Sequence, residues 1–299
     1  MIEHESVVSP VETSGIVWEM SIRKVCACAR IVLFTMIAVV HTAAESSASP
    51  KLYPIYVKIL VDEEEPTSSS EWQRRLGERV RQASGVISKY CDLRFVPYRF
   101  ATWKSDDRIN DFGRSLREFE SEVSYDPAQI AIGFSSQYRF QSGRNSAGGT
   151  RGPLNPHILI REGARSIHEP DRIEVLVHEL CHFLGAAHCA DQNSVMRTTL
   201  GDGRVRSKSF SIRLDSDNAR VVRLVGREVR DLRVRQFNQL TPATRTELRR
   251  HYVNLQHGLP SDKTAERYIQ LIDRTLDLGL QEYKRRKAVT GPAIRIEPP

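Results

Sequence analysis

One short run, HELCHFLGAAH from His178 to His188, constrains the fold more than any other part of the sequence. Residues four apart share a face of an α-helix, so His178 and His182 can direct their imidazole rings toward one point if the run is helical. Gly185 can leave the helix through a positive φ, which would bring His188 back toward the same point. The run therefore predicts a helix, a tight glycine turn and three histidines within one small volume.

His178, His182 and His188 are the candidate metal ligands, and Zn²⁺ is the expected cofactor, as a single ion. Neutral imidazole nitrogens bind Zn²⁺, and three protein ligands leave the fourth position open for water, as in catalytic zinc sites. Glu179 follows the first histidine, so its carboxylate is expected beside that water and not among the ligands. Two histidines at this spacing often bind no metal, but the added Glu, Gly and third His favour a zinc site.

The run matches HExxHxxGxxH, and in this the chain resembles the metzincin clan of zinc endopeptidases. Met196, eight residues after His188 in Ser194-Val195-Met196, is similar to the methionine of the clan's Met-turn, which lies beneath the zinc-binding histidines. The spacing is similar to that of matrixins, and Cys189 before this turn is similar to archaemetzincins, although archaemetzincins have a cysteine at the position of Ser194. The resemblance spans residues 52–235 and implies that Gly185 and Met196 support the site.

The resemblance implies a metalloprotease, a zinc hydrolase that cleaves protein or peptide substrates with a zinc-activated water, with Glu179 as general base and then general acid. It places the substrate antiparallel to an edge strand, which corresponds to His157–Arg161 and its Gly-rich approach loop. That loop has no Asp or Glu between Gln141 and Ile160, so calcium and structural zinc sites are not expected. Arg197 stands where astacins have a metal-binding tyrosine, so no fifth ligand is expected.

Two other functions stay open. One is a zincin-fold binding module with little activity, although loss of Glu179 would be its simplest signature and Glu179 is present. The other is a zinc amidase that acts on a non-protein amide, because the same activated water hydrolyses any accessible amide.

Strands and helices alternate irregularly, which predicts an α+β fold: a zincin-like, metzincin-like mixed twisted β-sheet with an active-site helix against it. Apolar and β-branched runs predict strands at 52–61, 93–102, 130–134 and 157–161, and helical periodicity predicts helices at 71–90 and from Pro170 to Gly185. Residues 141–156 are dense in Gly, Ser and Asn and are expected to form a loop.

The C-terminal part is expected to be helical. Asp215 to Asn218 can cap a helix through Val225, and Thr241-Pro242 begins a helix that ends near Gly258. Ser261 is expected to cap the second helix of a C-terminal helical hairpin. The predicted organisation is an N-terminal extension with signal peptide (1–44), a metzincin-like catalytic domain (45–238) and a helical C-terminal extension (239–299).

The N-terminal region is similar to a secretory leader. Basic residues precede a ten-residue apolar run, 31–40, and small residues follow at 41–44. The run is shorter than the roughly 20 residues that span a bilayer. We therefore expect a signal peptide at about 20–44, a true start at Met20, a secreted or periplasmic protein, and no membrane association after the leader is removed.

The charge is uneven. The chain has 44 Lys and Arg against 37 Asp and Glu, and residues 201–250 hold thirteen basic against six acidic residues. Such a surface could make a weak contact with a polyanion, whereas the simpler interpretation is a solvated arginine-rich helical face. No aromatic or glycine interleaving accompanies the charges, so no specific nucleic-acid partner is expected.

Cys91, Cys181 and Cys189 remain after the leader, so at most one disulfide can form. Cys181 is rotated off the metal-facing side of its helix and is expected to be a buried thiol or a disulfide partner of Cys91 or Cys189. The remaining histidines lack partner spacing and are expected not to be ligands: His41, His157, His168, His251 and His257.

Overall fold

The computed structural model describes residues 52–109, 111–137, 147–162, 168–207 and 211–289, without the side chains of 278–280 and 282–289. The predicted signal peptide, the Met20 start and residues 1–44 lie outside these ranges, so they stay predictions. Within the described residues, no helix is both long enough and apolar enough to cross a bilayer.

A five-stranded mixed sheet forms the centre of the fold, with strand order β2-β1-β3-β5-β4. Its strands are β1 (Tyr53–Asp62), β2 (Leu93–Trp103), β3 (Ile130–Ser135), β4 (Gly148–Thr150) and β5 (His157–Arg161). All pairs are parallel except β4 with β5, which is antiparallel. The predicted α+β class with a mixed sheet is confirmed.

The edge strand beside the site is β4, and the prediction that His157–Arg161 holds this position is wrong. β5 lies between β3 and β4 and pairs with both. Residues Gly148–Thr150, which were expected to be loop, form the last strand instead. Their sequence has no apolar alternation, so main-chain pairing with β5, and not side-chain pattern, defines this strand.

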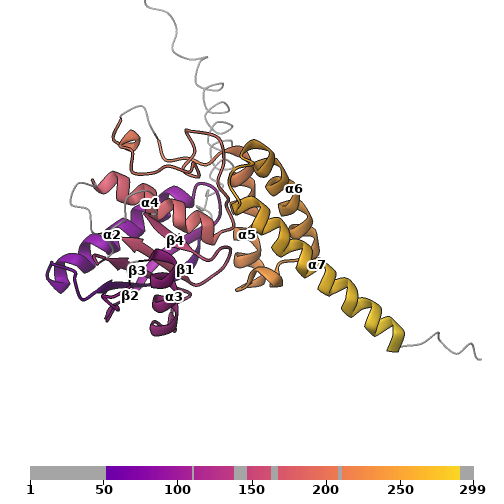
Figure 1. The fold of residues 1–299 in the computed structure, drawn as a ribbon, viewed down its shortest axis with the longest axis horizontal. Helices are drawn as coiled ribbons and strands as arrows, with labels where there is room; N and C mark the ends of the chain where they lie inside the picture. Colours follow the sequence, from indigo (N-terminus) through magenta and orange to yellow (C-terminus); the bar gives the residue numbers. More distant parts are fainter. Residues whose placement is uncertain (1–51, 110, 138–146, 163–167, 208–210, 290–299) are drawn as a thin grey trace, which may run out of the picture. The chain divides into compact units, whose positions relative to one another are not determined.

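Helices cover both faces of the sheet (Figure 1). Alternate side chains of β1 point to opposite faces: Ile59 belongs to the main core with α2 (Ser69–Ile87) and α4 (Glu169–Phe183), whereas Leu60 packs in a smaller core with α3 (Phe112–Glu122). The sequence pattern did not predict α3. It is short, and only Ser115, Leu116 and Phe119 are buried along it.

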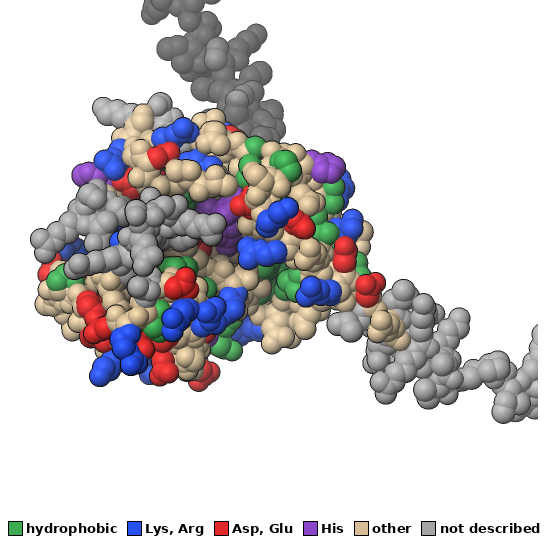
Figure 2. Space-filling view, viewed as in Figure 1, with side chains coloured by type: hydrophobic (Ala, Val, Ile, Leu, Met, Phe, Trp, Pro, Cys, Tyr) green, Lys and Arg blue, Asp and Glu red, His purple; other side chains and the backbone are tan. Residues whose placement is uncertain are grey.

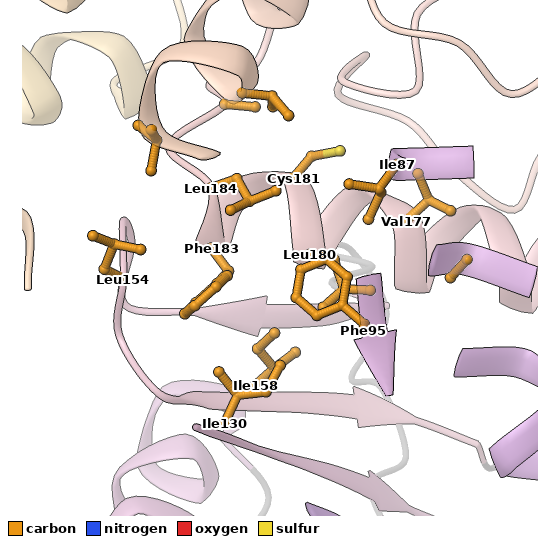
Figure 3. Packing of buried hydrophobic residues seen from close by; sticks show 14 of the residues in the cluster. Ile87, Phe95, Ile130, Leu154, Ile158, Val177, Leu180, Cys181, Phe183 and Leu184 are labelled. Carbon is orange, nitrogen blue, oxygen red and sulfur yellow. The ribbon is translucent and has the colours of Figure 1, made fainter. Parts of the chain in front are cut away.

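The apolar face of helix α4 determines which side of the helix faces the sheet. Figure 3 shows Leu180 and Phe183 directed toward the sheet, where Ile130 and Ile158 lie, and all four side chains are buried in the main core. Because residues of a helix repeat every 3.6 positions, this packing turns the opposite face of α4, with His178 and His182, away from the sheet.

Three further helices follow the site: α5 (Ser216–Leu232), α6 (Pro242–Gly258) and α7 (Thr264–Val289), with short 3₁₀ turns at Arg204–Arg206 and Phe237–Gln239. α6 and α7 form the predicted C-terminal hairpin (Figure 1). The predicted caps Asp215 and Thr241 accept from the main chain of Asn218 and Thr244. The prediction that Ser261 caps the second helix is wrong. α7 begins at Thr264, and Thr264 N donates to Asp262 Oδ1 at 2.8 Å.

Cys91, Cys181 and Cys189 are buried free thiols, so the buried-thiol alternative holds for Cys181. Arginines of the basic stretch form ion pairs with carboxylates of other elements, including Arg206 with Asp171 and Arg249 with Asp273. Part of this charge is therefore compensated locally, and the prediction of a weak polyanion contact stays untested.

Candidate metal centre

The three predicted ligands converge. α4 carries His178 and His182, and Gly185 turns the chain at φ +89° so that His188 returns to the same side. The Nε2–Nε2 distances are 3.0 Å for His178 and His182, 3.3 Å for His182 and His188, and 3.3 Å for His178 and His188. Tetrahedral Zn–N bonds of about 2.05 Å would separate ligand nitrogens by about 3.3 Å. The spacing therefore suits three ligands of one small cation.

The other ring nitrogens face hydrogen-bond acceptors. Nδ1 of His178 lies 2.7 Å from Val195 O, Nδ1 of His182 lies 2.7 Å from Ala186 O, and Nδ1 of His188 lies 2.8 Å from Asp262 Oδ2. A neutral ring that donates from Nδ1 has its lone pair on Nε2. With all three rings in this tautomer, the Nε2 lone pairs face one point, which suits a metal ion.

Burial keeps two of these rings neutral. It lowers the pKa of His178 to about 3, with a further contribution from His188, and it lowers the pKa of His182 far below 6.5. Neither ring carries a proton that a metal ion would have to displace near neutral pH.

Contacts from two later helices hold the turn that positions His188. Tyr252 Oη on α6 donates to Gly185 O at 2.8 Å. Asn218, on α5, brackets Ala187: its Oδ1 accepts from Ala187 N at 2.8 Å and its Nδ2 donates to Ala187 O at 2.9 Å. Both side chains are buried, so the turn is fixed by fully satisfied polar contacts.

The predicted Met-turn supports the first histidine. Arg197 N donates to Ser194 O at 3.2 Å to close a tight turn, and Met196 within it is fully buried. Val195 O in the same turn accepts from His178 Nδ1. Arg197 is itself buried and pairs with Glu174 of α4 at 2.7 Å, so its side chain anchors the turn to the helix and is not directed to the ligands.

Asp262 is a site residue that the sequence analysis missed. It lies between α6 and α7, 74 residues after His188, and its Oδ2 takes the hydrogen bond from His188 while Oδ1 takes that of Thr264 N. Burial disfavours its charged form, but the hydrogen bonds from Thr264 and His188 outweigh burial and lower the pKa of Asp262. The third candidate ligand is therefore oriented by a carboxylate from the C-terminal hairpin.

Glu179 lies beside the histidines in a buried position. The residue is 4% exposed, its Oε2 has no hydrogen-bond partner among the described residues, and a Cβ on Gly148 of β4 would lie 3.1 Å from its Oε1. Burial raises the pKa of Glu179 to about 8. A cation bound by the three rings would favour the charged form and lower this pKa.

A cavity of about 280 Å³ opens over these side chains, lined by the three histidines, Glu179, the β4 strand and side chains of α7. In Figure 2 the histidine surface lies in a hollow near the middle of the view. Thr264, Arg267 and Tyr268 line the α7 side, so the C-terminal hairpin supplies one wall.

The structure brings no other described histidine to this centre. His157 Nε2 contacts Val123 O at 2.8 Å on the far side of the sheet, and His251 Nδ1 lies 2.7 Å from Asp217. His168 and His257 also lie outside the cluster, while His41 is outside the described residues.

Neither a protein-family model nor a curated protein matches the chain. Among solved structures, the chain is similar to the archaemetzincin of Methanopyrus kandleri, with 16% identity, coverage of 59% of this chain and 96% of that chain, and a TM-score of 0.42. It is also similar to a chain in a structure of a chaperone-substrate complex, with 12% identity, coverage of 60% of this chain and 35% of that chain, and a TM-score of 0.43.

Proposed function

We propose that this protein is a zinc-dependent metallopeptidase that is exported by an N-terminal signal peptide and hydrolyses peptide bonds. The observation that carries the proposal is the convergence of three Nε2 atoms at 3.0–3.3 Å from one another, while the Nδ1 of each ring lies within hydrogen-bond distance of an oxygen acceptor. His178, His182 and His188 would hold the ion. Three ligands leave a position open toward the cavity, which is the arrangement of a catalytic zinc site.

When bound, Zn²⁺ supplies Lewis-acid polarisation of a substrate carbonyl and a lowered pKa for water. The Glu179 carboxylate would accept the proton of the attacking water and later donate it to the leaving amine. Both steps need a carboxylate within reach of the water, and Glu179 lines the same cavity as the three histidines.

β4 supports a peptide as the substrate. It is the last strand of the sheet among the described residues, and Gly148 at its start lies against Glu179. An extended peptide can add to such an edge through main-chain hydrogen bonds, which places its backbone amides beside Glu179. A small non-peptide amide would gain nothing from this edge.

The experiment is a paired metal and activity measurement on the purified chain. Wild type should bind one zinc per chain and cleave a mixed-peptide pool, and a chelator should abolish cleavage. Glu179→Gln should retain zinc but lose about 10²- to 10⁴-fold in turnover, the typical contribution of a general base. His182→Ala should lose the metal. Cleavage that continues after zinc removal, or full activity of Glu179→Gln, would refute the proposal.

The same measurement separates the alternatives. Zinc binding without peptide hydrolysis would favour the binding module or the amidase over the peptidase. Polyanion contact through residues 201–250 stays a weaker proposal, because arginines there already pair with carboxylates, as Arg230 does with Asp92 and Asp231. Export would be tested by the N-terminal sequence of the mature chain, which should begin near residue 45.

A further inference from the structure

A second cavity lies beside the metal-site cavity. It has a volume of about 210 Å³, and its wall contains Arg151, Arg267 and Arg274. Arg267 and Tyr268 line both cavities, so a molecule that fills one can extend into the other. No carboxylate lines the second cavity among the described residues.

Two of the three arginines carry uncompensated charge. Arg151 is neutralised by Glu120, whose oxygens lie 2.6 and 2.7 Å from its Nε. Arg267 and Arg274 form no ion pair with any residue that the structure describes. They are seven residues apart on α7, two turns of one helix face, so both guanidinium groups border the same cavity.

The carboxylates near these two arginines on α7 do not cancel that charge. Glu266 pairs with Lys263, and Asp273 pairs with Arg249 of α6. Asp277 lies one turn after Arg274 on α7. It does not line the cavity, and it forms no ion pair with Arg274. Figure 2 shows Lys and Arg side chains on the surface next to the histidine hollow. The second cavity is thus a cationic recess that leads out of the metal site.

The recess lies near the end of β4, next to the path of a peptide paired with this strand. Glu179 lies against Gly148 at the start of β4, and Arg151 follows the end of β4 three residues later, about 10 Å along the strand. The antiparallel ladder is the more stable form of strand pairing. A peptide paired antiparallel to β4 has its N-terminal part over Arg151, two or three residues before the bond beside Glu179.

We infer that the recess formed by Arg267 and Arg274 binds an acidic side chain of the substrate, two or three residues before the scissile bond. The inference rests on the proposed peptidase function. Guanidinium groups bind carboxylates through paired, charge-assisted hydrogen bonds, which neutral side chains cannot replace. The enzyme is therefore selective for acidic peptide sequences, and α7 determines this selectivity.

The test compares two peptides that differ only by Glu or Gln at each of these two positions. For wild type, kcat/KM should be about tenfold higher with the Glu peptide than with the Gln peptide. This factor lies between the typical contribution of an exposed ion pair and that of a charged hydrogen bond. The double variant Arg267→Gln, Arg274→Gln should bring this ratio close to one. The matched control is Arg94→Gln, an exposed arginine that lines neither cavity and should retain the tenfold ratio.

Peptide binding to zinc-loaded Glu179→Gln, measured by fluorescence anisotropy, keeps the two proposals separate. The Glu peptide should bind about tenfold more tightly than the Gln peptide, and high salt should reduce the difference. Equal cleavage and equal binding of both peptides would refute the acidic subsite while leaving the peptidase intact. Selective binding by a chain that cleaves neither peptide would support the subsite and refute the peptidase.

Discussion

Substitution of Asp262 should weaken zinc binding although this residue is no ligand. Its Oδ2 holds His188 Nδ1 at 2.8 Å and its Oδ1 holds Thr264 N at 2.8 Å. Loss of such an outer partner typically costs 10- to 100-fold in metal affinity, or about 1.4–2.7 kcal/mol. We expect this loss for Asp262→Ala, because His188 Nδ1 then keeps only its longer contact, 3.3 Å to Thr264 Oγ1, and the ring is held less firmly.

Asp262→Asn should be at least as damaging as Asp262→Ala. An asparagine has one acceptor oxygen for two donors, so its NH₂ group must face either Thr264 N or His188 Nδ1. In the second arrangement the amide donates to Nδ1, which favours the tautomer with a proton on Nε2, the atom that should bind zinc. A near-isosteric change is therefore expected to match or exceed truncation.

The assay is a competition titration of each variant with a chromophoric zinc indicator, together with thermal unfolding of the metal-free chain. Asp273→Asn serves as the control, since Asp273 lies in the same hairpin, on α7, but pairs with exposed Arg249. Its zinc affinity should equal that of wild type. An affinity for Asp262→Asn within twofold of wild type would refute the role assigned to the hairpin carboxylate.

Three other perturbations test the same geometry. Gly148→Ala places a Cβ 3.0 Å from Glu179 Cγ and should lower kcat about ten- to hundredfold with zinc retained; unchanged kcat would mean that Glu179 can move freely. Because the pKa of Glu179 is about 8 without metal and falls beside a dication, zinc binding should release a proton below about pH 8. Zinc affinity of wild type should then fall more steeply with decreasing pH than that of Glu179→Gln, and parallel curves would contradict this. A chain that ends at residue 238 should bind zinc at least ten- to hundredfold more weakly in equilibrium dialysis, because it lacks Asp262 and also Tyr252, which holds the Gly185 turn; wild-type affinity would refute the expectation.

The sequence predicted those parts of the site that depend on local geometry. His178 and His182 converge because they are four apart on one helix, and the positive φ of Gly185 follows from the absence of a side chain. The caps Asp215 and Thr241 were also correct, since a cap involves only the first turn of its helix.

The parts that the sequence did not predict depend on distant contacts. Asn218, Tyr252 and Asp262 have no spacing relative to the histidines that any periodicity could reveal. Asp262 had one usable signal: it stands just before a helix, where an acidic residue suggests a cap, and it does accept from Thr264 N. That it also accepts from His188 requires the hairpin to fold back onto the turn.

The same contacts bear on the predicted division at residue 238, which stays a prediction. Buried side chains of α6 and α7, including Leu248, Tyr252 and Ile272, belong to the core cluster that also contains Leu180 of α4. Each large apolar side chain contributes about 1.5–3 kcal/mol when buried, against a total stability of about 5–15 kcal/mol for a typical domain. A helical extension that fills the core, orients His188 and lines the cavity is physically part of the site. The last strand of the sheet ends at Arg161, well before residue 238, so the proposed zinc binding and selectivity would depend on side chains from both sides of that residue.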